Sequence, residues 1–212
     1  MSDQAISEVF AQATDAEMKA AELFYGAAHV FAGEVAALAG ITLNAAAAII
    51  AVLSPRSNWE GNQFDAIAVA SGCDFSCGGF QALGRDLERA RRIADGGRWS
   101  EILSGPKVIA FARNIMFPGR DVGIPVDRHL ARLALGWGMS DEELTRSLAR
   151  KGAYRDVEER YELLAGCQGL RPIVYANRVW YVVRRLRREG GQLSFSWRPL
   201  DWMPVGIDFQ GE

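Results

Sequence analysis

Two side chains of opposite charge begin two consecutive expected helices. Lys107 follows a Gly-Pro turn and Asp127 follows a Pro-Gly loop, in the segment 103–132 that reads L-S-G-P-K-V-I-A-F-A-R-N-I-M-F-P-G-R-D-V-G-I-P-V-D-R-H-L-A-R. This pattern predicts a turn at Gly105, a helix, a loop and a second helix. An amine and a carboxylate at two helix N-termini can face one cleft, where we expect the reactive site.

Each of these two side chains has a chemical and a structural interpretation. A neutral, buried lysine amine is a nucleophile that can form a Schiff base, whereas a charged Lys107 beside Gly105 suits an anion-binding turn. Asp127 can stabilise developing positive charge, or it can simply cap its helix. Because the two residues occur together, the pattern favours the chemical interpretation and leaves the structural one open.

The composition bounds the rest of the molecule. The 212 residues are 49% hydrophobic, which suits one globular unit or two lobes that share a cleft. The formal net charge of −2 provides no general basic field, so nucleic-acid binding has to rest on a local patch. No signal-peptide pattern is found, and the apolar run 45–53 is too short for a bilayer. We expect a cytoplasmic monomer without membrane association.

The cysteines indicate no metal site. Cys73, Cys77 and Cys167 form an odd and sparse set, which favours a reducing compartment. The pair Cys73-x3-Cys77 lacks the further ligands that a zinc or iron–sulfur site needs. We therefore expect no metal and no cofactor.

The spacing of apolar residues predicts an all-α fold. The alanine-rich segment 43–53 is expected to be a buried central helix, and Ser140 with Glu143 is expected to form a capping box. One helical domain is predicted over 1–189, followed by an irregular tail, 190–212, packed on the body. The expected helices are 2–12, 15–39, 43–53, 63–70, 81–93, 99–103, the two that begin at Lys107 and Asp127, 140–150, 157–165 and 172–189.

Three blocks of the sequence resemble the helix–hairpin–helix DNA glycosylase superfamily, whose typical member is endonuclease III. The first, A-V-L-S-P-R-S-N-W-E-G-N at 51–62, is similar to the family's buried helix and polar loop. The second joins L-S-G-P-K-V-I-A-F-A-R-N-I-M-F to I-P-V-D-R-H-L-A-R, where the family has L-P-G-x-G-x-K-T-A and a V-D-T-H-style helix start. The third joins V-E-E-R-Y-E-L-L to Y-A-N-R-V-W-Y-V-V. The likeness covers residues 43–188, implies a two-lobed helical fold, and extends in its first two blocks to short phage-encoded members.

The chain also departs from the family pattern. Its hairpin, S-G-P-K, is shorter than the usual form, which weakens the expected contact with a DNA phosphate. The loop between Lys107 and Asp127 is longer, the four-cysteine iron–sulfur motif of many members is absent, and the tail from Gly190 has no counterpart.

The resemblance implies an enzyme that breaks the N-glycosidic bond of a damaged or modified base flipped out of DNA. Asp127 would stabilise the positive charge that builds on the sugar, and Lys107 would attack C1′ and permit strand cleavage by β-elimination. An alternative is a phage transferase that acts on activated hydroxymethyl-uracil bases during thymine hypermodification. A third is a DNA-binding module without catalytic activity. For a phage-encoded protein the location would be the host cytoplasm.

Further residues are candidates for contact with DNA or with the base. Arg56 lies where the family's loop reaches into the duplex, and Asn58, Trp59 and Asn62 offer amides and an aromatic face for a base edge. Core packing of Trp59 and turn hydrogen bonds of the asparagines are equally open. Gly105 is expected at the phosphate-binding turn.

Histidine, tyrosine and arginine side chains near the ends of the expected helices complete the candidate set. His129 can relay protons or bind a backbone carbonyl, and Tyr175 can stack on a base or pack in the core. His29, on an apolar helix, is expected to be structural. An arginine run near the C-terminus can contact phosphates or form a solvated helix face; it comprises Arg184, Arg185, Arg187 and Arg188.

Overall fold

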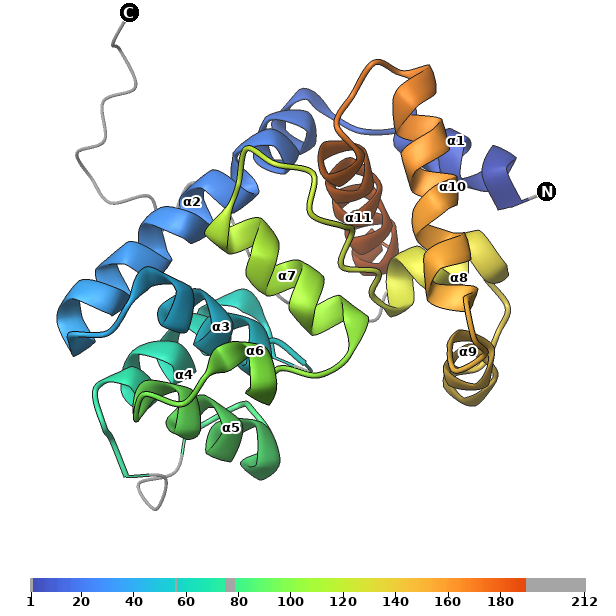
Figure 1. The fold of residues 1–212 in the computed structure, drawn as a ribbon. Coiled ribbons are helices and arrows are strands. Elements are labelled where there is room, and N and C mark those ends of the chain that lie inside the picture. The colour runs from blue at the N-terminus through green and yellow to red at the C-terminus, as the bar shows by residue number, and fades with distance from the viewer. Residues whose placement is uncertain (1, 56, 75–78, 190–212) are drawn as a thin grey trace, which may run out of the picture.

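The computed structural model describes residues 2–55, 57–74 and 79–189, and Figure 1 shows their arrangement. Over these residues the regular structure is helical, so the predicted all-α class is confirmed. The predicted tail, 190–212, lies outside the described residues. The elements are α1 (Ser2–Phe10), α2 (Asp15–Ala39), α3 (Leu43–Leu53), α4 (Trp59–Ala70), α5 (Gly84–Ala94), α6 (Trp99–Ile102), α7 (Pro106–Met116), α8 (Arg128–Leu135), α9 (Asp141–Leu148), α10 (Ala153–Cys167) and α11 (Pro172–Glu189).

Reciprocal capping boxes fix the starts of two helices. At α2 the Thr14 hydroxyl accepts from the Glu17 amide, and the Glu17 carboxylate accepts from the Thr14 amide at 2.9 Å. At α9 the predicted box between Ser140 and Glu143 is confirmed. Each box satisfies backbone donors that a helix end leaves unpaired.

Side-chain caps also fix the starts of α4 and α3, and the start of α4 differs from the expected one. The Asn58 side chain accepts a 2.7 Å hydrogen bond from the Gly61 amide, so α4 begins at Trp59, four residues before the expected start. The Thr42 hydroxyl caps α3, accepting from the Ala45 amide at 3.2 Å, and α3 begins at Leu43 as expected. In both places a polar residue next to a turn belongs to the helix start.

Buried hydrophobic side chains form two large clusters. The first core is centred on α3, with α2, α4, α5 and α7 packed against it. The second core lies between α1, α8, α9, α10 and α11. A small third cluster, formed by Ala20, Ala21 and Tyr181, joins α2 to α11.

Helix α3 is the buried centre of the first core. Every residue from Ala46 to Leu53 is buried, which confirms the predicted central helix. In the described part of the chain no single helix is both long and apolar enough to cross a membrane. α2 and α3 are long and apolar enough only when they are taken together, and they are bent by 112° where they meet.

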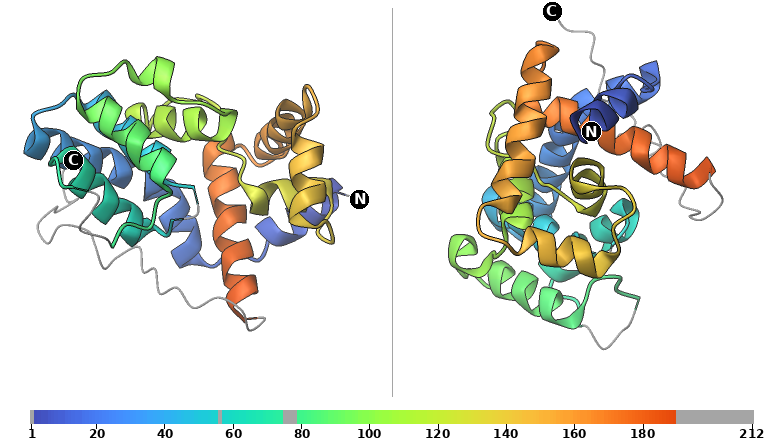
Figure 2. Two further views of the ribbon diagram at one scale, coloured as in Figure 1. Left: turned by 90° about the horizontal axis from the view of Figure 1, so that it is seen from below. Right: turned by 90° about the vertical axis from the view of Figure 1, so that its right-hand side faces the viewer.

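Helix α11 contributes to both cores. Ile173 and Val174 lie in the first core, whereas Tyr175, Val179 and Val183 lie in the second. Figures 1 and 2 show α11 running between the two groups of helices. The first turn of α11 therefore contributes to the first core, and its later turns contribute to the second.

Ion pairs hold α11 against α2. Arg178 pairs with Glu22 at 2.8 Å, and Arg185 pairs with Glu17 at 2.9 Å. Arg185 also donates to the Gln12 carbonyl at 2.8 Å. These two arginines of α11 thus have structural partners.

Candidate functional site at the junction of the two cores

Asp127 caps α8 and accepts three N–H hydrogen bonds. Its Oδ1 accepts from the backbone amides of His129, at 2.8 Å, and Leu130, at 3.0 Å, while its Oδ2 accepts from Trp180 Nε1 at 2.9 Å. The structural interpretation of Asp127 as a helix cap is therefore confirmed. A carboxylate has roughly four acceptor positions, so one position on Oδ2 is left for another group.

Polar side chains from α7 and α10 hold the loop 123–126 that leads into Asp127. Asn114 donates to a loop carbonyl at 2.7 Å, and Glu158 accepts from a loop amide at 3.0 Å. The Tyr154 hydroxyl donates to one loop carbonyl and accepts from one loop amide, both at 2.8 Å. Burial raises the pKa of Tyr154 and of Glu158. These bonds fix the backbone from which the Asp127 carboxylate projects.

Trp180 connects Asp127 to a group of partly exposed aromatic rings. The Phe24 ring centroid lies 6.5 Å from that of Trp180, 5.4 Å from that of Trp59 and 6.3 Å from that of Phe111. We call these four residues, from α2, α4, α7 and α11, the aromatic cluster. All four side chains are only partly buried. The cluster places π surface beside a carboxylate.

Lys107 lies at the start of α7, one residue after Pro106. Gly105 precedes the helix with φ 84° and ψ 135°, a conformation that favours glycine. Lys107 is half-buried and makes no hydrogen bond or ion pair with the described residues. Because Lys107 and Phe111 are four residues apart, they share one face of α7. The amine therefore lies one turn from the aromatic cluster.

Lys107 and Asp127 approach the junction from the two different cores. α7 packs in the first core and α8 in the second, and Figures 1 and 2 show the N-terminal ends of both helices at the junction. No hydrogen bond or ion pair among the described residues joins Lys107 to Asp127. They are connected through Phe111, Phe24 and Trp180.

His129 faces Arg187 of α11. The imidazole Nδ1 lies 3.0 Å from a guanidinium nitrogen of Arg187. A guanidinium only donates, so Nδ1 is the acceptor and the ring is neutral. Burial lowers the pKa of His129; Asp127 opposes this shift, and Arg187 adds to it. His129 thus binds a side chain rather than the expected backbone carbonyl.

Three predicted base-binding residues have structural roles instead. Asn58 caps α4. Asn62 is 2% exposed and donates to the Ile50 carbonyl at 2.9 Å. Tyr175 is 1% exposed and stacks on Phe10 with 4.3 Å between ring centroids. This burial contradicts direct base contact by Asn62 and Tyr175, because a backbone carbonyl holds the Asn62 amide and a stacked ring covers Tyr175.

The remaining predicted residues divide between the core and the undescribed part of the chain. Trp59 packs on Phe24 and on Phe31, so the core interpretation is confirmed, although its ring also belongs to the aromatic cluster. His29 donates from Nδ1 to the Ile115 carbonyl at 2.8 Å, as expected of a structural histidine. Arg56 lies outside the described residues.

Sequence reasoning missed the residues that connect the site. Trp180 and Phe111 lie inside longer motifs without a role of their own, and Phe24 lies outside those motifs. The one available signal was Phe111, which lies in the same block as Lys107 and Asp127. No local pattern pairs Trp180 with Asp127, because 53 residues separate them. Among the described residues no group of His, Cys, Asp and Glu side chains is placed to hold a metal ion.

Comparison with known proteins assigns a family. The chain belongs to DUF7178, a family of unknown function, whose model matches residues 1–187. No curated protein and no solved structure matches the chain. The matched region includes Lys107, Asp127 and Trp180 and both hydrophobic cores.

Proposed function

We propose that this protein processes a base in DNA, and that it cleaves the N-glycosidic bond of a flipped-out nucleotide at Asp127. One observation carries the proposal: a carboxylate oriented by three N–H donors borders the aromatic cluster. The likeness of three sequence blocks to helix–hairpin–helix glycosylases supports it.

The aromatic cluster provides the chemistry that a flipped base needs. A base that leaves the duplex loses its stacking, and protein rings replace that stacking in proportion to the π surface they offer. Stacking of one base on an aromatic side chain contributes about 1–3 kcal/mol. Phe24, Phe111 and Trp180 are partly exposed rings from three helices, so a base can contact them without unfolding either core.

Asp127 fits the electrostatic demand of the reaction. When the C1′–N bond breaks, the bonding electron pair leaves with the base and positive charge develops on the sugar. A carboxylate that is already oriented stabilises this charge without reorganisation. Water then adds to C1′ and loses a proton, and the products are a free base and an abasic site. Oδ2 is the oxygen with acceptor capacity left for this role.

Lys107 has two possible roles in the same reaction. As a nucleophile, its amine would bond to C1′ while the base departs; ring opening would give a Schiff base, and β-elimination would release the 3′ phosphate. As a cation, it would hold a phosphate beside the turn at Gly105. The structure supports access for both roles, because Lys107 is half-buried and its ammonium has no partner among the described residues.

A product assay tests the role of Asp127. Duplex oligonucleotides with damaged or phage-type modified bases are incubated with the protein and analysed by mass spectrometry for abasic sites. We expect the product from the wild-type protein and its loss in Asp127→Asn. Asp156→Asn, which removes an exposed carboxylate from α10, is the matched control and should keep activity. Equal activity of Asp127→Asn and wild type would overturn the proposal.

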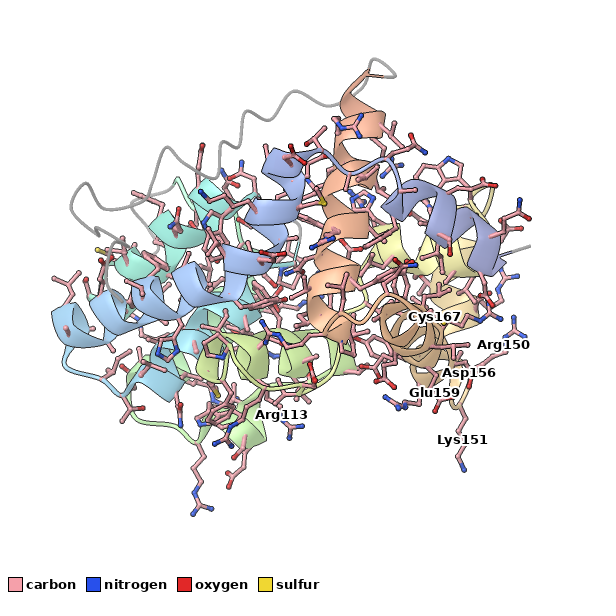
Figure 3. The ribbon with its side chains drawn as sticks, turned by 90° about the horizontal axis from the view of Figure 1, so that it is seen from above. Arg113, Arg150, Lys151, Asp156, Glu159 and Cys167 are labelled. Carbon is pink, nitrogen blue, oxygen red and sulfur yellow. The ribbon has the colours of Figure 1, made fainter. Side chains whose placement is uncertain are left out.

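Borohydride trapping tests the role of Lys107. A covalent adduct with DNA that disappears in Lys107→Ala, and persists in Lys151→Ala, identifies the nucleophile. Figure 3 shows Lys151 projecting outward between α9 and α10, so it is a control for the loss of one lysine charge. Abasic product without an adduct assigns Lys107 to phosphate binding.

The same assays separate the other two functions. Activity confined to pyrophosphorylated hydroxymethyl-uracil, with a mass increase of the base, would indicate group transfer in place of hydrolysis. Binding to DNA with no turnover of any base, unchanged by Asp127→Asn, would indicate a DNA-binding module. Both results contradict glycosylase activity.

A further inference from the structure

Helix α2 buries one face and leaves the opposite face exposed. Its buried side chains pack in the first core and against α11. Figure 1 shows α2 along an edge of the molecule, with α3, α7 and α11 on one side of it. Residues spaced three or four apart share one side of a helix. We call the exposed and partly exposed residues opposite the buried side the outer face of α2: Lys19, Leu23, Gly26, Ala27, Val30, Glu34 and Ala37.

The centre of the outer face is apolar and is not covered by the described part of the chain. Leu23 is 37% exposed and Val30 is 39% exposed, and they lie two turns apart on the same side of α2. Gly26 lies between them, and a Cβ atom added there would meet open space. Single exposed apolar residues are common on protein surfaces, but an aligned pair beside open space forms a strip on which another helix can pack.

Side chains of opposite charge lie at the two ends of this apolar strip. Lys19 lies one turn before Leu23, and Glu34 lies one turn after Val30. Both charged residues are exposed, and neither makes a hydrogen bond or an ion pair with the described residues. By contrast, the two glutamates of α2 that contact α11 each pair with an arginine. The charges of the outer face are therefore available to a binding partner.

The outer face is complementary to itself when two copies of α2 run antiparallel. A two-fold axis midway between Leu23 and Val30 places each residue opposite the one that lies equally far on the other side of the axis. Leu23 then lies opposite Val30 of the second copy. Lys19 lies opposite Glu34 of the second copy, and the symmetry forms each of these pairs twice. A parallel pair of helices would instead bring Lys19 against Lys19, which is unfavourable.

We propose that α2 binds a second copy of this chain, with the two helices antiparallel and in contact through their outer faces. The inference does not depend on the proposed function. Charge complementarity selects this occupant, because the outer face carries both members of the ion pair in symmetric positions. Gly26 and Ala27 lie at the two-fold axis, where small side chains allow the helix axes to approach to about 8 Å. One helix pair is a small interface, so we expect a reversible dimer in place of the monomer predicted from the sequence.

Charge reversal tests the ion pairs of the proposed dimer. The dissociation constant of the dimer is measured for the full chain by sedimentation equilibrium. In Lys19→Glu both ion pairs become pairs of like charge, and we expect the dissociation constant to rise about tenfold. Glu34→Lys should have the same effect. The double variant Lys19→Glu, Glu34→Lys exchanges the charges and should restore the wild-type value, which a loss of folding could not do.

An aspartate at the centre of the outer face tests the apolar contact. Val30→Asp places two unpaired carboxylates in the dimer interface, and we expect the dissociation constant to rise by at least about a hundredfold. Leu163→Asp introduces the same charge at a 64% exposed position of α10 and should leave the dimer unchanged. Both positions are exposed, so circular dichroism should show a folded protein for each variant.

Other occupants of the outer face would give different results. A monomer at every concentration overturns the proposal, and a lower thermal stability of that monomer in Val30→Asp would indicate that segment 190–212 of the same chain covers the face. Binding to phosphatidylcholine vesicles that is lost in Val30→Asp, without a dimer, would assign the face to a membrane surface. A dimer that none of these variants weakens uses another surface and equally overturns the proposal.

Discussion

At the scale of single residues, Tyr154 fixes the loop that carries Asp127. Its hydroxyl is hydrogen-bonded to the carbonyl of Ile124 and the amide of Val126. Tyr154→Phe removes both bonds, and the two backbone groups lose their partner. We expect the free energy of unfolding to fall by about 1–3 kcal/mol in a denaturant titration. Leu163→Ala, at a 64% exposed position of the same helix, should change it by less than about 0.5 kcal/mol.

His129 gives the molecule a pH dependence with a defined sign. Burial lowers its pKa in the folded protein, so the unfolded chain binds the proton more readily and stability rises with pH. The contribution is present above the unfolded pKa of about 6.5 and is lost as the pH falls below it. Wild type should therefore lose more stability than His129→Gln on acidification, measured by urea titration at several pH values. Parallel pH profiles for the two proteins would contradict this prediction.

At the scale of elements, the start of α7 depends on the backbone freedom of Gly105. Its φ of 84° is unfavourable for residues with a Cβ atom, although open space surrounds the position that a Cβ would take. Gly105→Ala should therefore cost about 1–3 kcal/mol from backbone strain alone. Gly26→Ala, in the interior of α2 and equally without neighbours, should stabilise by about 0.5–1 kcal/mol. Thermal unfolding of the two variants should shift in opposite directions.

The existence of the helices was predictable from sequence, but some of their starts were not. The apolar periodicity of α2 and the alanine-rich, apolar sequence of α3 identified those helices, because these side chains fill the first core. α10 begins at Ala153, four residues before the expected start, after Gly152 in a left-handed conformation. Asn58 was interpreted as part of a turn although it caps α4. Caps and turns use the same residue types, so sequence alone does not separate them.

At the scale of the whole molecule, α11 couples the two cores. Ile49 is fully buried in the first core, and Ile49→Ala should cost about 2–5 kcal/mol through the cavity that it leaves. Because α11 belongs to both cores, we expect unfolding to remain a single transition. Native-state hydrogen exchange should show the same loss of protection in α10 as in α3. A loss limited to α3 would mean that the cores unfold independently.

The candidate site was predictable in its two charged residues and not in its surroundings. Lys107 and Asp127 begin helices, and local patterns identify helix starts. Which side chains surround them depends on how α11 packs between α2 and α8, a long-range arrangement. The contacts of Trp180 with Asp127 and of Arg187 with His129 join residues 53 and 58 positions apart. Such pairs follow from tertiary packing rather than from spacing.

Two exposed cysteines, one near each hydrophobic core, allow the distance between the cores to be measured in the native protein. Cys73 follows α4, which packs in the first core. Cys167 is the last residue of α10, which packs in the second core. Both thiols are free and exposed to solvent. With Cys77 replaced by serine, spin labels on these two positions would report the separation of the cores by pulsed electron resonance. Spectra recorded with and without an oligonucleotide would then show whether the halves of the molecule close around a ligand.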